Sequence, residues 1–395
     1  MSHHFPHTQS LEYSLRREVT EIYLSVTIKH FGLALLSVFE VIYLFEWFGS
    51  SLALLLLFYG MNYVLHALFT PFAAMLVNRI GVKKSILLAN PFIILFFVSL
   101  LFLPSWPWLI IPALLSIAIY HAIFWLAFHI DFSRFANPEH RGRQTSMLLA
   151  IPMIAHAIGP LLGGFLITEF GFSVLFLVVI ICLGVSVLPL FFSREVHEPF
   201  HLHWRQTFHY AFSFRHWRRN LVFIGDGISG KISVVVWPVF LFLAITNFVD
   251  LGVINSVAFL LTLLMGLYIG HLTDSPRRRV VLTLGAIFTS FGWLARILLK
   301  TPWQLFAFDA YGRVSRRIID VPYNALFYKS AYEHGENKAA FIASYEIVTN
   351  LFGGFFLILL AALANMVDPF IAAFVTAGIF TAFFPIMPDS NKKEK

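Results

Sequence analysis

The stretch Asn-Arg-Ile-Gly-Val-Lys-Lys at residues 78–84 is a short basic turn that separates two long apolar runs. A second stretch of the same kind, Gly-His-Leu-Thr-Asp-Ser-Pro-Arg-Arg-Arg, lies roughly half a chain further on, at residues 270–279. It also separates two apolar runs, and runs of this length are typical of membrane helices. The repeated unit of apolar helix, charged turn and apolar helix therefore predicts two related halves that cross a membrane.

The composition of the chain supports a membrane location without any motif. Of its 395 residues, 58% are hydrophobic, 17% are aromatic and only 12% are charged, and the mean hydropathy is +0.78. A soluble domain carries about 25% charged residues. This chain therefore has too few charges to cover the surface of a soluble globular protein.

The apolar runs have the length that a bilayer requires of a helix, about 20 residues each. Several contain Pro or Gly, which helices in lipid tolerate when their neighbours satisfy the backbone. The sequence predicts an all-α membrane protein with twelve spans, at residues 22–46, 51–77, 85–103, 107–130, 146–168, 172–192, 221–246, 251–272, 280–299, 303–323, 340–365 and 368–387.

The distribution of Lys and Arg predicts the orientation of these spans. Turns that follow even-numbered spans are basic, and both chain ends are basic, whereas the opposite turns are short and mostly acidic. We therefore expect both termini to be cytoplasmic and the protein to lie in the cytoplasmic (inner) membrane. The net charge of +7 follows from this topology and from contact with anionic lipid headgroups, so nucleic-acid binding is not needed to explain it.

A polar stretch at residues 193–220 divides the spans into two sets of six. We expect an N-terminal bundle at residues 1–192 and a C-terminal bundle at residues 221–395, joined by this linker. Around Trp204, Phe208 and Phe212 the apolar spacing is helical, with polar residues on another face. Such a segment is expected to lie in the cytoplasmic interface of the membrane.

Both basic turns resemble the loop between the second and third helices of each half in the major facilitator superfamily. The second turn matches the family pattern well, while the first has Ala74 in place of Gly and Asn78 in place of Asp. The stretch Pro-Glu-His-Arg-Gly at residues 138–142 is a further resemblance, and the likeness covers essentially the whole chain.

The resemblance implies a fold and a mechanism. It implies twelve helices in two six-helix pseudo-repeats, which rock about a cavity at the midplane of the membrane. The signature loops would form a latch between helix ends on the cytoplasmic side. The residues implied for this latch are Asn78, Arg79, Gly81, Lys83, Asp274, Arg277 and Arg278.

A motif in the fifth span bears on the direction of transport. Gly159, Pro160, Gly163 and Gly164 resemble the end of a motif that marks drug/proton antiporters of the superfamily, although Ser146 and Ala155 replace its upstream glycines. The alternative interpretation is simple close packing between the fifth and eighth spans, because small residues let helix backbones approach.

The tenth span carries a stripe of charges, which is expensive in hydrocarbon and marks a pathway or a paired structural site. Steps of three or four residues place Asp309, Arg313, one of Arg316 and Arg317, and Asp320 on one helical face. We expect Asp309 and Arg313 to bind substrate or exchange a proton. The lower group is expected to form cytoplasmic ion pairs, for which the candidates are Asp131, Arg141, Arg316, Arg317 and Asp320.

In the superfamily the first, fourth, seventh and tenth spans line the cavity. The resemblance therefore implies, as cavity residues, Glu40, His121, Trp125, Lys231, Asp309 and Arg313. The family's proton-coupling Arg in the fourth span has no counterpart in residues 107–130. This leaves Glu40 or Asp309 as the expected protonation site.

Histidines outside the spans raise a metal hypothesis, because imidazole suits zinc, nickel and copper. They cluster near the N-terminus and in the central loop, at His3, His4, His7, His197, His201, His203, His209 and His216. No carboxylate or Cys cluster accompanies them at a defined spacing, so we expect no metal site and no cofactor.

These observations predict a monomeric, multi-pass secondary transporter rather than an enzyme, and no Gly-rich phosphate loop with a Lys supports ATP-driven transport. The expected partners are a small-molecule substrate, protons as the coupling ion and the lipid bilayer, with no nucleic acid. The leading hypothesis is proton-coupled export of a small organic compound. The first alternative is import of a nutrient or organic anion bound by Arg313 and Lys231, and the second is a non-transporting receptor.

Overall fold

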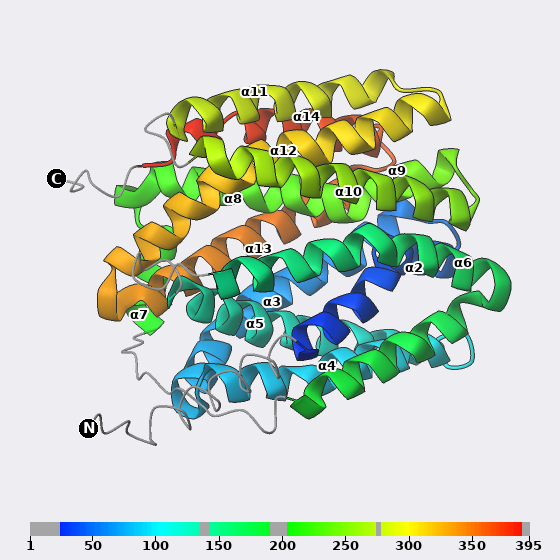
Figure 1. The fold of residues 1–395 in the computed structure, drawn as a ribbon, viewed down its shortest axis with the longest axis horizontal. Helices are drawn as coiled ribbons and strands as arrows, with labels where there is room; N and C mark the ends of the chain where they lie inside the picture. The colour runs from blue at the N-terminus through cyan, green and yellow to red at the C-terminus, as the bar shows by residue number, and fades with distance from the viewer. Residues whose placement is uncertain (1–23, 135–142, 190–203, 274–277, 389–395) are drawn as a thin grey trace, which may run out of the picture.

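The computed structural model describes residues 24–134, 143–189, 204–273 and 278–388, and all regular elements within these ranges are helices. The helices run roughly side by side along the long axis of the molecule (Figure 1). Apolar side chains cover them on all sides, as expected of helices packed among one another and against lipid.

The N-terminal half contains five long or paired helical segments. They are the helix Leu24–Leu36 followed by α2 (Phe39–Trp47), α3 (Leu52–Ile80), α4 (Val82–Phe102), the short η1 (Pro107–Leu109) followed by α5 (Ile110–Arg134), and α6 (Arg143–Val187). Inside α6, Gly171 has a φ of 79° and a non-helical conformation. Figure 1 shows α6 reaching one end of the bundle and turning back there.

The C-terminal half begins with the linker helix α7 (Trp204–Phe212), which lies within the stretch predicted to be an amphipathic segment. The helices that follow are η4 (Phe214–His216), α8 (Trp217–Lys231), the π-helix η5 (Ile232–Val236), α9 (Trp237–Ala244), α10 (Phe248–Thr273), α11 (Arg278–Ala295), η6 (Arg296–Leu298), α12 (Pro302–Glu333), η7 (Gly335–Asn337), α13 (Lys338–Leu363), α14 (Pro369–Thr381) and η8 (Phe384–Ile386).

The number of spans depends on how two elements are counted. Among the described residues, 9 helices are long and apolar enough to cross a membrane, or 10 if Leu24–Leu36 and Phe39–Trp47, bent by 42°, form one span. The predicted twelve also require α6 to count as two spans at Gly171, and α12 to span despite its charged stripe. The count of twelve therefore stays a prediction.

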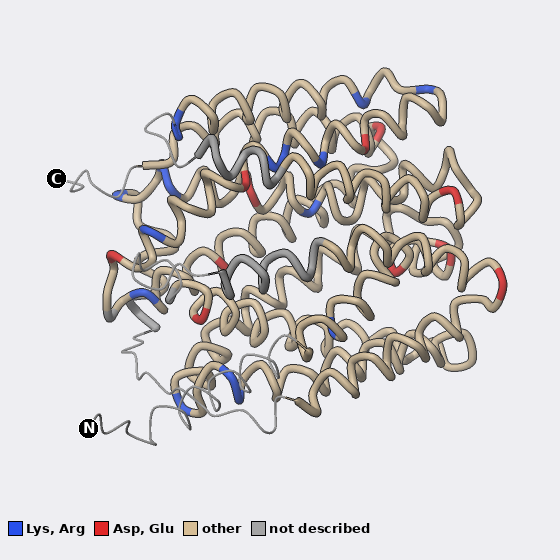
Figure 2. The backbone as a smooth tube through the Cα atoms, in the orientation of Figure 1, with Lys and Arg blue, Asp and Glu red and all other residues tan. Residues whose placement is uncertain are grey.

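Charged residues are distributed unevenly along the long axis. Figure 2 shows Lys and Arg gathered mostly at the end of the bundle where α3 meets α4, and Asp and Glu at the opposite end and in the interior. We call the first of these the basic end. Its charge agrees with the cytoplasmic side expected from the sequence.

Glycines bring α6 into backbone contact with the first helix of its own half and with α10 of the other half. A Cβ atom added to Gly163 of α6 would lie 1.9 Å from the Leu35 carbonyl oxygen, and one added to Gly164 would lie 2.3 Å from the Phe248 carbonyl oxygen. Gly252 of α10 is equally close to α6, since its Cβ would lie 2.4 Å from the Pro160 carbonyl oxygen. The Gly-Pro motif of the fifth span therefore joins α6 to the first helix and to α10, which favours the packing interpretation.

Candidate functional site

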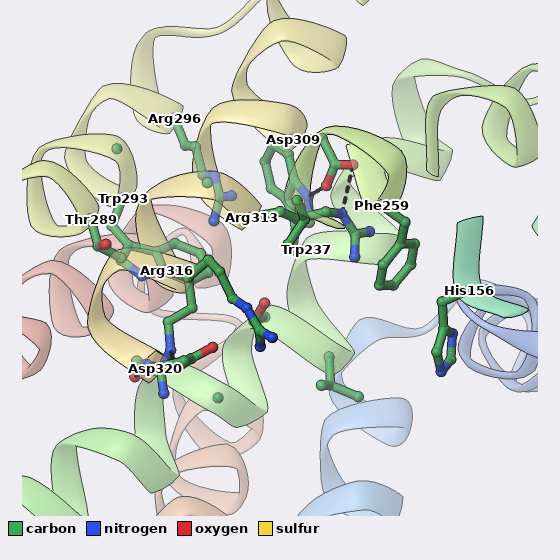
Figure 3. Close-up of a pocket in the computed structure, with 18 of the residues that line it drawn as sticks. His156, Trp237, Phe259, Thr289, Trp293, Arg296, Asp309, Arg313, Arg316 and Asp320 are labelled. Atoms are coloured by element: carbon green, nitrogen blue, oxygen red, sulfur yellow. Dashed lines mark hydrogen bonds and ion pairs between the residues drawn. The ribbon is translucent and has the colours of Figure 1, made fainter. Parts of the chain in front are cut away.

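A cavity of about 400 Å³ lies in the C-terminal half and faces the N-terminal half. Its walls come from α8, η5, α9, α10, α11, η6 and α12, while α6 contributes His156 from the other half. Figure 3 shows Arg313 on α12 between Asp309 and Phe259, with His156 beyond the phenyl ring. The cavity combines aromatic rings with four Arg and two Asp side chains.

Asp309 is the centre of the upper part of the cavity. It is 1% exposed, and both of its carboxylate oxygens have partners. Trp237 Nε1 donates a hydrogen bond to Oδ1 (2.7 Å), and Arg313 Nε donates one to Oδ2 (3.0 Å). The Arg313 guanidinium also bonds to the Asn255 side chain and lies 4.3 Å from the centre of the Phe259 ring. Asp309 therefore positions Arg313 and is not itself open to a ligand.

Arg296 lies beside this group and was not predicted from the sequence. Its guanidinium is held between two indole rings, 3.9 Å from the centre of Trp237 and 4.0 Å from that of Trp293. The residue is only 4% exposed, and its Nε has no hydrogen-bond partner among the described residues. A desolvated cation between aromatic faces is stabilised by about 2 kcal/mol or more, but the unsatisfied N–H still favours an acceptor.

Space for this guanidinium depends on Gly312. A Cβ atom at that position would lie 2.1 Å from an Arg296 terminal nitrogen. The same nitrogen is 3.5 Å from the Phe308 carbonyl oxygen, so it makes only a long hydrogen bond to the neighbouring helix. Arg296 is therefore packed tightly but bonded weakly, with its charge directed at the cavity that it lines.

The lower part of the cavity contains an ion-pair network around Arg316. Its guanidinium bonds to the carboxylates of Asp226 on α8 and Asp320 on α12, the latter at 2.7 Å, and to the Ser229 hydroxyl at 3.2 Å. Tyr345 of α13 donates a hydrogen bond to the second oxygen of Asp226 (2.8 Å). The structure thus joins Arg316 to Asp320, as the stripe on the tenth span suggested, and adds Asp226 from another helix.

A second polar cluster lies where the two halves meet. One carboxylate oxygen of Glu346, on α13, lies 3.2 Å from His66 Nε2 of α3. The other oxygen lies 3.2 Å from His129 Nε2 of α5. Asn350 donates a hydrogen bond to the first oxygen (3.0 Å), and His129 Nδ1 lies 2.7 Å from the Tyr328 hydroxyl of α12. We call Glu346, His66, His129 and Tyr328 the seam cluster. Each residue type was visible as an intramembrane polar group, but no sequence spacing indicates that four helices meet there.

The sequence profile of the Major Facilitator Superfamily matches residues 22–251, which is more than half of the chain. The chain belongs to this superfamily. Its helices and its family together place it among multi-pass membrane proteins. The chain is also similar to the uncharacterized protein YqgE of Bacillus subtilis (strain 168), with 23% identity over 215 residues, which are 53% of this chain and 50% of YqgE. The chain thus spans about half the length of this curated relative.

Of the six cavity candidates that the superfamily resemblance implied, Asp309 and Arg313 line the cavity described above. Glu40 instead accepts a hydrogen bond from Tyr59 (2.9 Å) inside the N-terminal half. His121 is near the seam cluster, with its ring centre 5.8 Å from that of His66.

The other two candidates also lie outside this cavity. Lys231 Nζ lies 3.9 Å from the centre of the Tyr63 ring, across the boundary between the halves. Trp125 is 40% exposed and stacks on His129 at 5.8 Å. These four residues therefore do not form one site with Asp309 and Arg313.

Lys29 is a buried cation that the sequence analysis did not single out. It lies on the first helix, is 8% exposed, and its Nζ is 3.9 Å from the centre of the Phe124 ring and 5.2 Å from that of Tyr120. A lone Lys inside an apolar run of residues 22–46 was the available signal for it.

The superfamily's signature loops are described only in part. Asp274, Arg277 and Arg141 lie outside the described residues, so the predicted latch and one predicted ion-pair partner stay predictions. In the first loop, Arg79 is in the last turn of α3, and Gly81 has a φ of 91°, a conformation that suits Gly. The Gly81 carbonyl accepts a hydrogen bond from Ser85 (2.6 Å), which fixes the start of α4.

No group of three or more His, Cys, Asp or Glu residues able to hold a metal ion is found in the part of the chain that the structure describes. Most of the histidines behind the metal hypothesis lie outside that part, including His3, His4 and His7.

Proposed function

We propose that this transporter carries a small organic anion with an apolar or aromatic body through the cavity lined by Arg296 and Arg313. Transport would proceed by alternating access, in which the two halves expose the cavity to one side of the membrane and then to the other. Of the hypotheses left open by the sequence, this is the organic-anion alternative.

The charge of the side chains that line the cavity is the main support for this proposal. Four Arg residues line it, namely Arg296, Arg313, Arg316 and Arg317, against the two acids Asp309 and Asp320. In the upper part of the cavity, Arg296 and Arg313 share the single carboxylate of Asp309, so two cations face one acid there. A surplus charge in a low-dielectric site is stabilised strongly by a counter-ion of opposite sign.

The contacts of the acids argue against a cationic substrate. Asp309 already accepts bonds from Trp237 and Arg313, and Asp320 is bonded to Arg316. A cation would have to displace these partners, whereas an anion would meet the guanidinium groups of Arg296 and Arg313, which line the cavity. The aromatic rings of Trp237, Trp293 and Phe259 supply apolar surface for the rest of the ligand.

Export and proton coupling are separate proposals. Export was inferred from the Gly-Pro motif of α6, and close packing accounts for that motif. The geometry of the cavity favours neither direction, so the direction would follow from the coupled gradients.

Thermal unfolding of the purified protein tests the substrate class. We expect stabilisation by benzenesulfonate more than by succinate or inorganic phosphate, none by tetraphenylphosphonium, and loss of the effect in Arg296→Gln and Arg313→Gln. Ligand at about a hundredfold excess over Kd stabilises by about 2.7 kcal/mol, which such an assay resolves. Lys300→Gln is the matched control, because it removes an exposed charge outside the cavity.

The opposite pattern would overturn the anion proposal. Stabilisation by tetraphenylphosphonium that is lost in Asp309→Asn would support the cation-exporter hypothesis instead. Stabilisation by an anion with no flux in proteoliposomes would support the receptor alternative.

A further inference from the structure

The seam cluster joins the two halves through one carboxylate. Glu346 belongs to α13 in the C-terminal half, whereas His66 of α3 and His129 of α5 belong to the N-terminal half, and each imidazole lies 3.2 Å from a different oxygen. Glu346 is 4% exposed and His66 is 2% exposed. Ionisable groups buried this deeply in a membrane protein are expensive and mark a functional pathway or switch by default.

We propose that Glu346 is a proton-binding site of the transporter, and that its protonation releases His66 and His129 and opens the seam at the basic end. The site concerns the coupling ion, so its role in transport rests on the proposed function. The proton itself can be tested without any substrate.

The hydrogen-bond donors around the Glu346 carboxylate in the closed seam indicate that it is ionised. A ring nitrogen and a carboxylate oxygen at 3.2 Å need one hydrogen between them. If each imidazole carries that hydrogen on Nε2, both histidines can be neutral, and His129 Nδ1 then accepts from the Tyr328 hydroxyl at 2.7 Å. Asn350 adds a third donor to the same carboxylate. An ionised carboxylate suits two imidazoles at this distance and the Asn350 donor together, while a protonated one does not.

A proton added to Glu346 opposes this arrangement. It removes the charge of the carboxylate, and hydrogen bonds to a neutral group are about half as strong as those to an ion. The closed seam is then weakened relative to an open one in which water solvates the groups.

Other ionisable groups on the helices around Glu346 also face it. Those within electrostatic range, besides His66 and His129, are His121 of α5, Lys231 of α8, Tyr328 of α12 and Tyr345 of α13. When Lys231 is protonated, its charge favours the ionised form of Glu346 and disfavours a proton on His66, which agrees with the assignment above.

The seam cluster is also placed where the halves must separate. Its His129–Tyr328 contact joins α5 to α12, and Phe132 and Tyr328 follow towards the basic end with ring centres 4.6 Å apart. Glycines continue the contact towards the other end, where a Cβ atom added to Gly60 of α3 would lie 3.0 Å from the Gly354 carbonyl oxygen of α13. Opening the basic end therefore requires both imidazoles to leave Glu346.

Distances between spin labels across the basic end test this proposal on the whole protein. Labels at Lys84→Cys on α4 and Tyr332→Cys on α12, both exposed, would report the separation, in a Cys182→Ala background because Cys182 is the one native cysteine. We expect the open population to grow as the pH falls below about 5, because the contacts of the closed seam favour ionised Glu346 and a water-solvated Glu binds its proton at about pH 4.3. The open-to-closed ratio should approach a change of about tenfold per pH unit, the limit for one linked proton.

Variants separate a proton site from a merely structural contact. Glu346→Gln mimics the protonated acid, so we expect a high open population at every pH and loss of the pH dependence. Glu346→Asp keeps a titratable acid and should keep the pH dependence. Glu169→Gln is the matched control, because Glu169 is an exposed acid of α6 outside the seam cluster and its loss should leave the pH dependence intact.

Three results would overturn the proposal. They are a wild-type distance distribution that does not change with pH, a shift towards closure in acid, and a Glu346→Gln variant that keeps the wild-type pH dependence. Should Glu346→Gln fail to fold, His129→Phe removes one of the two donors across the seam. It must then raise the open population at neutral pH, and an unchanged population would equally contradict the proposal. Absence of anion binding would affect the proposed substrate class only.

Discussion

At the scale of single residues, the charge balance of the cavity depends on which groups share the carboxylate of Asp309. One carboxylate accepts from Trp237 and Arg313 and lies near Arg296, so it partly neutralises two buried cations. Breaking a buried ion pair by removing one partner typically costs about 3–5 kcal/mol, because the other charge is left uncompensated. The same loss of negative charge makes a bound anion more favourable.

Asp309→Asn is therefore expected to lower the melting temperature and, at the same time, to increase the stabilisation by the anions of the panel. Asn keeps an acceptor for Trp237 Nε1, so the indole need not move. The measurement is thermal unfolding with and without each anion. A variant that unfolds earlier but gains no anion-induced shift would contradict the charge argument.

The residues that could be predicted from the sequence are those that share one helix. Asp309 and Arg313 are four apart on α12, and their spacing predicted a shared helical face, on which the structure shows them in contact at 3.0 Å. Arg296 could not be assigned in the same way, since its partners Trp237 and Trp293 come from α9 and α11. A single sequence carries no spacing rule for contacts between helices.

At the scale of elements, the glycines of α6 set how close the halves can approach. Glu346 and its two histidines come from three different helices, so the approach of these helices determines whether the seam cluster can form.

The sequence located most of the spans because their apolar runs are long. It could not indicate the π-helical turn of η5, whose five residues, Ile-Ser-Val-Val-Val, carry no helix-breaking signal.

Replacement of Gly163 by Ala tests the packing interpretation of the Gly-Pro motif. The new Cβ would lie 1.9 Å from the Leu35 carbonyl oxygen, so the two helices must separate. Overpacking of this kind costs about 1–3 kcal/mol, and we expect a lower melting temperature. Gly184→Ala on the same helix is the control, because nothing lies within 4 Å of its Cβ position. Equal stability of the two variants would contradict the interpretation.

At the scale of the whole molecule, the two halves touch at both ends of the bundle. Phe132 and Tyr328 meet near the basic end, and Phe45 of α2 and Phe242 of α9 lie 6.5 Å apart near the other. Alternating access requires one of these contacts to open while the other holds. Composition and charge distribution predicted the membrane fold and its expected orientation, but the cavity and the seam could be found only from the packing of helices far apart in sequence.

If the positive charge of Arg296 and Arg313 selects an anion for transport, replacement of Arg296 must abolish that transport. The most direct measurement is uptake of radiolabelled benzenesulfonate, which stays ionised, into proteoliposomes containing the wild type, Arg296→Gln or Lys300→Gln. We expect saturable flux in the wild type and in Lys300→Gln, and its loss in Arg296→Gln. Flux that is equal in all three proteins, or found for tetraphenylphosphonium in place of every anion of the panel, would contradict it.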